Sequence, residues 1–423
     1  MDTVATAEKN GFMNTAPLLQ GGKSFRPKAS HRPRYLRNSK LARRARSLVP
    51  ALRSRRFSLM TTFLSTLLST LLSTLLSPLT SISVPAFLLT LFFAVHASAA
   101  EHGVILVYHH VATDTPPSTT ISPDNFRAHL EHLRDNGYTV IALPQLIENL
   151  QQQAPVPDKA VAITFDDGYI SIYEQAFPML QEFGYPFTLF VSTGPINARQ
   201  PGYMNWEQIR EMSEAGVTIA NHMVDHPYML NRTDDENEAD WLQRMKNELL
   251  EAESSISQET GQNHRFLAYP YGEFNGELKA ILEEEGFVGF AQNSGAVGFH
   301  SDFLAVPRYP LASIYANLDT AATKFGTLSF NVKQLEPNSP VTDSTRPATI
   351  LKFEPGDYNY SQIGCFADGE PLTMNWLDRE EGTLQLQADK DFNGRRWRYI
   401  CTAPDPGSSR YFWFSVQWIN PDR

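Results

Sequence analysis

Cysteine is scarce in this sequence of 423 residues, and the two that occur, Cys365 and Cys401, both lie near its C-terminal end. For an exported chain we predict a disulfide between them, with two buried free thiols as the alternative.

Basic residues are scarce in the body of the chain. Of 36 Lys and Arg, fourteen precede Ala100, against two of 46 Asp and Glu, which leaves 22 basic and 44 acidic residues. Such an acidic body predicts no nucleic-acid partner and suits a neutral or cationic ligand.

Charge is absent altogether from Phe57 to Val95, directly after a basic stretch that begins at Lys23. The charge-free run contains a Leu-Ser-Thr-Leu repeat and leads to Ala97-Ser98-Ala99, a small-x-small cleavage signature. We therefore interpret residues 1–99 as a basic leader and signal peptide, and expect a periplasmic, cell-envelope or extracellular protein. The alternative is an uncleaved anchor, since a run of this length can span a bilayer. This leader is the only membrane contact that the sequence predicts, and the oligomeric state is left open.

Strand and helix patterns alternate from Val104 to about Phe325. Repeated β–α units of this length predict a parallel sheet, either open or closed into a barrel. Beyond Asn331 the segments are short, strand-like and separated by turns, which predicts a small all-β sandwich. The expected organisation is an α/β catalytic domain at residues 100–328 and a β-sandwich domain at residues 329–423.

The segment from Ala160 to Tyr169 reads as a buried strand that ends in two carboxylates, Asp166 and Asp167, followed by Gly168. Charges at the end of a buried strand are costly unless something binds or pairs them. The glycine permits a sharp turn, so both carboxylates can converge on one point. The alternative is an ordinary Asp-Asp-Gly turn after a strand.

A second polar cluster follows the expected strand Val217–Ala220, where His222 and His226 are four residues apart. On one face of a helical turn, two such histidines can reach one metal ion. Together with one carboxylate they would form a catalytic zinc-type site, and the other carboxylate would be free to act as a base. A third strand end carries Tyr269-Pro270-Tyr271-Gly272, which on its own is an ordinary turn.

In this order, the three motifs resemble those of the polysaccharide deacetylases of carbohydrate esterase family 4, the NodB-homology domain. The first is Thr164-Phe165-Asp166-Asp167-Gly168, the second His222-x-x-x-His226-Pro227, and the third Tyr269-Pro270-Tyr271-Gly272. The resemblance covers about residues 104–325. With Tyr108-His109-His110, it is most similar to the poly-N-acetylglucosamine deacetylase branch.

The resemblance implies a distorted (β/α) barrel and one divalent metal ion, zinc first and cobalt or nickel as alternatives. Asp167, His222 and His226 would hold this ion. Asp166 would be the general base toward water, and the backbone N–H of Tyr271 would stabilise the oxyanion.

Two departures from the family pattern leave roles to be filled. The family often has Arg at the position of Ala268, where it orients the base, and Arg308 is the candidate replacement. The family's late Leu-x-His-Asp motif, which supplies a general acid, is missing, and His300 is a candidate by residue type alone. Trp206 and Tyr269 are the expected substrate contacts. His109 and His110 are expected to support their strand end rather than to bind metal.

The function that the sequence predicts is therefore metal-dependent removal of N-acetyl groups from the N-acetylglucosamine units of a polysaccharide. Poly-N-acetylglucosamine, peptidoglycan and chitin-like glycans all remain as substrates. One alternative is a secreted carbohydrate-binding protein on a catalytically decayed deacetylase scaffold. Another is a related metal-dependent amidase that acts on a small amide.

Overall fold

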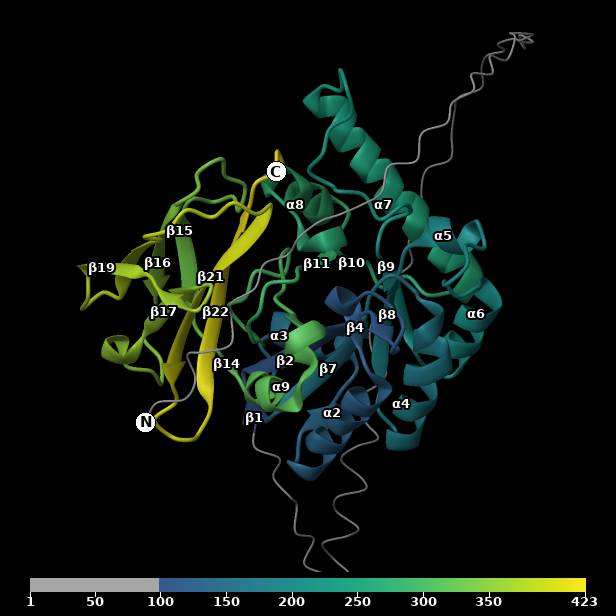
Figure 1. The fold of residues 1–423 in the computed structure, drawn as a ribbon, viewed down its shortest axis with the longest axis horizontal. Coiled ribbons are helices and arrows are strands. Elements are labelled where there is room, and N and C mark those ends of the chain that lie inside the picture. Colours follow the sequence, from purple (N-terminus) through teal and green to yellow (C-terminus); the bar gives the residue numbers. More distant parts are fainter. Residues whose placement is uncertain (1–98) are drawn as a thin grey trace, which may run out of the picture. The chain divides into compact units, whose positions relative to one another are not determined.

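The structure, a computed structural model, describes residues 99–423, which lie in one compact unit (Figure 1). The predictions made for the leader fall outside the described residues, apart from Ala99 itself. Within the described part, no helix has both the length and the apolar character that a membrane crossing requires.

A sheet of mainly parallel strands forms the first part of this unit. Its hydrogen-bonded path runs β11-β10-β9-β8-β7-β2-β12, and the added strands β5 and β13 pair with β7 and β2. The strands are β2 (His102–Tyr108), β5 (Thr139–Val140), β7 (Ala160–Phe165), β8 (Phe187–Val191), β9 (Thr218–Asn221), β10 (Phe266–Ala268), β11 (Val288–Phe290), β12 (Val297–Gly298) and β13 (Tyr309–Pro310). Within this sheet β12 pairs in antiparallel fashion, and the other pairings are parallel.

Helices connect these strands and pack against the sheet (Figure 1). They are α2 (Pro123–Asp135), α3 (Leu143–Gln151), α4 (Phe177–Phe183), α5 (Thr193–Asn197), α6 (Trp206–Glu214), α7 (Glu238–Thr260), α8 (Gly276–Glu284) and α9 (Leu318–Phe325). Their ends follow local chemistry. The Ser122 side chain caps α2 ahead of a first-turn proline, and Asn205 forms a capping box with Gln208 at the start of α6. Gly261, with φ of 74°, ends α7 in the left-handed conformation.

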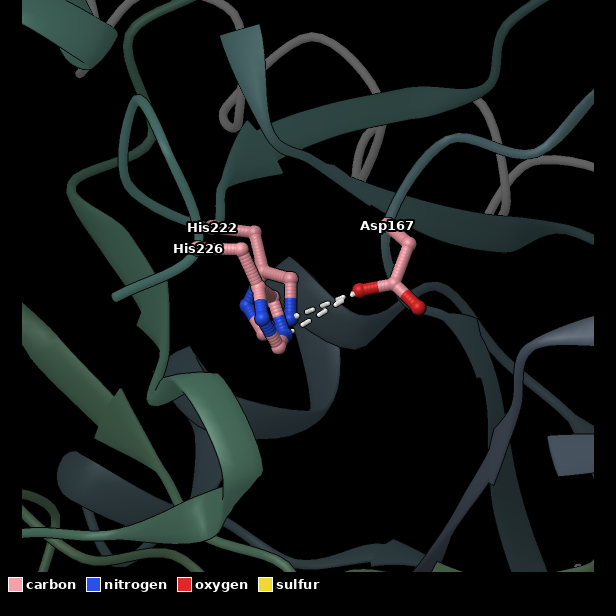
Figure 2. Close-up of side chains that lie close together, drawn as sticks. All are labelled: Asp167, His222 and His226. Carbon is pink, nitrogen blue, oxygen red and sulfur yellow. Dashed lines mark ion pairs between the residues drawn. The ribbon is translucent and has the colours of Figure 1, made fainter. Parts of the chain in front are cut away.

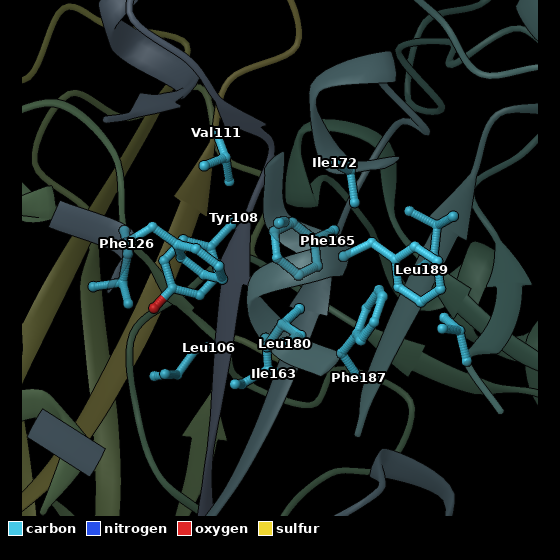
Figure 3. Packing of buried hydrophobic residues seen from close by; sticks show 14 of the residues in the cluster. Leu106, Tyr108, Val111, Phe126, Ile163, Phe165, Ile172, Leu180, Phe187 and Leu189 are labelled. Carbon is cyan, nitrogen blue, oxygen red and sulfur yellow. The ribbon is translucent and has the colours of Figure 1, made fainter. Parts of the chain in front are cut away.

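Alternate residues of each strand enter two different apolar clusters, because successive side chains point to opposite faces of the sheet. Leu106, Ile163 and Leu189 belong to the cluster that packs against α2 and α4 (Figure 3). Ile105 of β2 shares the other cluster with Phe290 of β11, although these strands lie near opposite ends of the hydrogen-bonded path. The sheet must therefore curl for these two side chains to share one cluster.

One connecting segment joins the two edges of the curled sheet. Val306 bridges to Phe290 beside β11, and Tyr309 of β13 pairs with Leu106 of β2. The expected barrel is thus present as a curled parallel sheet with its edges joined through residues 306–310. Arg308 lies in the middle of this segment.

The chain becomes all-β after α9. One sheet has the order β14-β22-β21-β17-β18 and the other β15-β16-β20-β19, and side chains from both form a second core. The strands are β14 (Leu328–Ser329), β15 (Val332–Glu336), β16 (Ala348–Phe353), β17 (Gly364–Ala367), β18 (Glu370–Pro371), β19 (Thr373–Asp378), β20 (Thr383–Gln387), β21 (Arg396–Pro404) and β22 (Tyr411–Ile419). We refer to residues 328–423 as the β region. Cys365 and Cys401 lie opposite each other on β17 and β21 and form the expected disulfide.

Four very short strands of the described residues lie outside these sheets. They form two small pairs: β1 (Ala99–Ala100) with β6 (Val156–Pro157), and β3 (His110–Val111) with β4 (Thr120–Ile121).

Candidate active site

The three motifs meet because each follows the C-terminal end of a parallel strand. Asp166 and Asp167 follow β7, His222 follows β9, and the loop from Tyr269 follows β10. These strands lie in one parallel sheet, so their C-terminal ends share one edge. The sheet topology thus brings together residues that lie up to about a hundred positions apart in the chain.

Asp167, His222 and His226 form a compact cluster at this edge (Figure 2). Asp167 Oδ1 lies 3.2 Å from His222 Nε2 and 3.3 Å from His226 Nε2. One potential ligand atom from each residue lies within 4.8 Å of the others. Among the described residues, this is the group that could hold a metal ion, and we call it the metal-type cluster. Asp167 and His222 are buried, whereas the side chain of His226 retains 24% of its exposure. The cluster is therefore open to solvent on the His226 side.

The tautomer of His222 follows from its second contact. Its Nδ1 lies 2.7 Å from the carbonyl oxygen of Ala268. A carbonyl oxygen can only accept, so Nδ1 carries the hydrogen and the lone pair of Nε2 faces the cluster. Ala268 occupies the position where the family often has arginine, and here its backbone orients a histidine.

The two histidines do not lie on a helical turn, which corrects the expectation from their spacing. The segment after β9 is a loop, and the backbone of Met223 (φ 66°) and of His226 (φ 51°) is left-handed. Asp167 (φ 75°) is left-handed too. Such conformations are uncommon for non-glycine residues and cluster at functional sites. It is the folded loop, and not helical periodicity, that brings His226 back beside His222.

Two buried atoms of the cluster lack a hydrogen-bond partner. They are Asp167 Oδ1 and His222 Nε2, which face each other. Buried polar atoms are ordinarily satisfied, and an orphaned pair calls for a missing ion or water. One carboxylate oxygen and two imidazole nitrogens are the donors of catalytic zinc sites. The residues present therefore fit a divalent ion such as zinc.

Burial disfavours the charged form of each group in the cluster, and neighbouring charges decide the direction of its pKa shift. For Asp167, the contact with His222 and the charge of His109 outweigh burial, and the pKa is lowered. For His222, burial is outweighed by the contact with Asp167 and the charge of Asp166, so the pKa is raised. For His226, burial dominates and lowers the pKa to about 4. Asp167 is thus ionised and His226 neutral at neutral pH, which are the forms that bind metal.

Asp166 is fully buried and paired with Arg308. Arg308 Nη1 donates to Asp166 Oδ1 at 2.7 Å and Nη2 to Oδ2 at 2.8 Å, and both side chains are fully buried. Arg308 Nε also donates to the carbonyl of Ala291 at 2.9 Å, which fixes the guanidinium plane. Burial alone would raise the pKa of Asp166, but the charges of Arg308 and His222 and the hydrogen bonds from Arg308 together outweigh it and lower the pKa. The full burial of this pair excludes a surface ion pair. Orientation of a base by Arg308, and the alternative of a structural salt bridge, both stay predictions.

Tyr271 forms an aromatic wall beside the cluster. Its ring packs edge-on against His226, with centroids 4.4 Å apart, and stacks on Tyr228 at 3.9 Å and 6°. Burial, followed by the influence of Tyr228, raises the pKa of Tyr271 to about 12, so its hydroxyl stays protonated. Sequence reasoning missed Tyr228, and the signal that could have found it is its position directly after the His-Pro of the second motif.

Two of the expected site residues lie elsewhere. Tyr269 is fully buried, and its hydroxyl donates to the carbonyl of Leu304 at 2.8 Å. A side chain in the core cannot touch a polysaccharide, so the prediction that Tyr269 contacts substrate is wrong. His300 follows β12, which pairs with the N-terminal end of β2, opposite to the edge that carries the site. Topology thus removes His300 as a candidate acid.

Trp206 remains a prediction as a substrate contact. It is half-buried at the first position of α6, and its Nε1 donates to Asn197 Oδ1 at 2.7 Å. The ring packs on the apolar cluster that contains Leu106, Ile163 and Leu189.

His109 and His110 follow β2 beside the carboxylates. His110 stacks on Tyr169 with centroids 3.7 Å apart, as a residue that supports the strand end should. His109 is partly exposed, and its charge acts on Asp166 and on Asp167. His109 therefore faces the site more closely than the sequence suggested, and the Tyr108-His109-His110 run was the signal for it.

Comparison with known proteins agrees with these motifs. The family model described as polysaccharide deacetylase matches residues 153–290, the span that contains the Asp-Asp pair, both histidines and Tyr271. The chain carries a polysaccharide deacetylase domain.

Individual relatives match about half of this chain. YxkH of Bacillus subtilis, whose name states a polysaccharide deacetylase without a specific substrate, is 28% identical over 205 residues. The match covers 48% of this chain and 69% of that protein. The poly-beta-1,6-N-acetyl-D-glucosamine N-deacetylase of Escherichia coli is 24% identical over 50% of this chain and only 36% of its own length. The structure of IcaB from Ammonifex degensii is 27% identical, with a TM-score of 0.48 over 54% of this chain and 98% of that one.

Proposed function

We propose that this protein is a metal-dependent N-deacetylase that removes acetyl groups from N-acetylglucosamine units of a polysaccharide. One observation carries the proposal: Asp167, His222 and His226 converge at one point, next to a second carboxylate held by arginine. A pure binding protein has no need of either arrangement. This completeness supports an enzyme over a binding protein on a decayed scaffold.

We propose that Asp167, His222 and His226 hold a divalent ion, zinc first and cobalt or nickel as alternatives. When bound, such an ion supplies Lewis acidity toward the acetamide carbonyl and lowers the pKa of water. The buried, ionised Asp167 would offset the charge of such an ion. The Ala268 carbonyl binds Nδ1 of His222, which would leave the Nε2 lone pair available as a ligand.

The remaining residues would handle the protons and the developing charge. Asp166, ionised and held in the plane of the Arg308 guanidinium, would accept a proton from the attacking water. The backbone N–H of Tyr271 would donate to the oxyanion that forms on the acetyl carbon. The leaving amine needs a proton, and we assign its delivery to His109, the partly exposed residue that follows β2 at the strand end beside Asp166.

A polymer of N-acetylglucosamine is the substrate class that we propose, with peptidoglycan and chitin-like glycans as the other members. The likeness to poly-beta-1,6-N-acetyl-D-glucosamine N-deacetylase supports the first. The solvent-exposed His226 side of the cluster gives a long chain access to the site. The disulfide between Cys365 and Cys401 supports an oxidising compartment, so we propose that the enzyme works outside the cytoplasm.

The test is an acetate-release assay on poly-N-acetylglucosamine, peptidoglycan and chitin oligomers, with zinc, cobalt and nickel measured on the same sample. Asp166→Asn should keep its metal and lose activity by about 10²- to 10⁴-fold, the usual contribution of a general base. His222→Ala should lose the metal itself. Asp225→Asn, which alters an exposed carboxylate on the same loop, is the matched control and should behave as wild type.

Three results would contradict the proposal. They are a wild-type protein that holds no divalent metal, Asp166→Asn that releases acetate at the wild-type rate, and glycan binding without acetate release in saturating zinc, cobalt or nickel. The last would favour the binding-protein alternative. Activity on small amides alone would favour the amidase.

A further inference from the structure

The loop that carries Tyr271 is held by the β region. Arg395, the residue before β21, donates from Nε and Nη2 to the two carboxylate oxygens of Glu273, each at 2.8 Å. Glu273 is fully buried, and the side chain of Arg395 is 15% exposed. A buried carboxylate is tolerated only when it is paired and hydrogen-bonded. The fold of this loop therefore depends on a residue more than a hundred positions further along the chain.

Two further donors from the β region bind the two residues before Glu273. Arg396 Nη1 donates to the carbonyl of Tyr271 at 2.6 Å. Gln417 Nε2, on the adjacent strand β22, donates to the carbonyl of Gly272 at 2.7 Å. Three consecutive residues of the loop are thus each bound by a different side chain of the β region. A covering domain without a role at the site would not need such a matched set.

These contacts lead directly to the metal-type cluster. The guanidinium of Arg395 lies 4.5 Å from the ring centre of Tyr228, and that of Arg396 lies 5.3 Å from the ring of Tyr271. The two rings are stacked on each other, and Tyr271 packs edge-on against His226. A continuous series of contacts therefore runs from β21 through two aromatic rings to one of the three ligand-type side chains.

The backbone of the loop needs such external support. Tyr271 has φ of 59°, a left-handed conformation that is energetically unfavourable at a residue other than glycine. At Gly272 a Cβ atom would lie 2.8 Å from the backbone N of Gln292, so the loop packs directly on its neighbour. Strained conformations persist only where the surroundings over-determine them. Here the donors of the β region supply that constraint.

We infer that Arg395 and Arg396 are positioning residues of the deacetylase, and that the β region completes the active site instead of serving as a separate module. They would act through Tyr271: its backbone N–H toward the oxyanion, and its ring against His226. This inference rests on the proposed function and extends it to the C-terminal part of the chain.

The test uses the full-length protein and compares Arg396→Ala with Arg396→Lys and with the control Arg346→Ala. Arg396 is 39% exposed, so its removal spares the core. Arg346 also forms an arginine ion pair in the β region, with exposed Asp391. We expect Arg396→Ala to lower kcat per zinc-loaded site by about 10- to 100-fold, the scale of a small misplacement. KM should change little, because the lost interaction acts in the transition state.

Normalising to zinc-loaded protein separates positioning from folding, because a folding defect removes loaded sites without slowing those that remain. Arg396→Lys should recover part of kcat, since its ammonium group can still donate to the Tyr271 carbonyl. Arg396→Ala should bind zinc about tenfold more weakly, so its zinc dissociation constant should rise, as is usual when a group that orients a metal ligand is removed. If Arg396→Ala does not fold, Gln417→Ala is read in the same way.

A wild-type kcat per loaded site in Arg396→Ala, or an equal loss in Arg346→Ala, overturns the inference. If the wild-type protein releases no acetate from any of the glycans, the proposed function fails instead. The zinc dissociation constant then decides the positioning role alone. A higher zinc dissociation constant in Arg396→Ala alone supports that role, and equal zinc dissociation constants in all variants overturn it.

Discussion

Two regions of this molecule use the same pair of groups, a buried carboxylate clamped by both arms of an arginine. At the edge of the sheet, Asp166 is held by Arg308, and both side chains are fully buried. In the third-motif loop, Glu273 is held by Arg395, which keeps part of its surface in solvent. The first pair joins two segments of the deacetylase domain, and the second joins that domain to the β region.

The difference lies in what else each carboxylate touches. Asp166 is adjacent in sequence to Asp167, and its charge acts on His222, so its ionisation is coupled to the metal-type cluster. Among the described residues, Glu273 forms its ion pairs with Arg395 and Arg396, both of the β region. The same ion pair therefore orients a reactive group in one region and anchors a loop in the other. Variants that remove each arginine should separate these two uses.

The largest effect is expected from Arg308→Met. Removing one partner of a fully buried ion pair leaves an uncompensated charge, which costs about 3–5 kcal/mol in the free energy of unfolding. Acetate release should fall by about 10²-fold or more, because Asp166 loses both its orientation and its ionised state. Urea unfolding and the acetate assay measure the two effects on one preparation.

The double variant Arg308→Met with Asp166→Asn sharpens this result. A neutral amide beside methionine leaves no buried charge, so most of the lost stability should return while activity stays absent. If activity survives in Arg308→Met, the arginine does not orient the base, and Asp166 works without it.

A smaller effect is expected from Arg395→Ala. It also leaves a buried carboxylate, Glu273, but solvent reaches the arginine and Arg396 remains 3.7 Å away. We therefore expect a loss of about 2 kcal/mol, below the range of a fully buried pair. In contrast to Arg308→Met, Asp166 stays oriented, so activity should fall less than tenfold per folded molecule.

Glu273→Gln is the matched variant for this pair, since the amide keeps the shape of the side chain and removes its charge. Combined with Arg395→Ala it should recover much of the lost stability. A loss in Arg395→Ala as large as that in Arg308→Met would erase the proposed distinction between the two pairs.

Much of this arrangement follows from sequence because strand ends carry it. The run Ala160–Phe165 is buried on both faces and is apolar except for Thr164, so Asp166 and Asp167 mark the end of the strand. The same reasoning located His222 after β9, whereas Arg308 became a candidate only through the family resemblance and its missing arginine. Local pattern could not show the loop that folds His226 back, since this depends on left-handed residues such as Met223.

Sequence reasoning failed where tertiary packing decides. Tyr269 and Tyr271 are two positions apart, yet one lies in the core and the other faces the cluster, because the backbone turns left-handed at Tyr271. The contacts of Arg395 and Arg396 with the loop cross more than a hundred residues. No periodicity or local motif could have predicted them.

The smallest effect is expected at the aromatic stack that the two regions share. Tyr228 is 37% exposed, and it lies between Arg395 and Tyr271. Tyr228→Ala should remove a stacking interaction of about 1 kcal/mol, and lower kcat/KM by roughly fivefold through a less rigid Tyr271. Tyr228→Phe keeps the ring and should retain wild-type kcat/KM in the acetate assay. If kcat/KM falls as far in Tyr228→Phe as in Tyr228→Ala, the loss comes from the hydroxyl and not from the stacked ring. Tyr228 would then act as a polar group of the site through its hydroxyl, and not as support for Tyr271 through its ring.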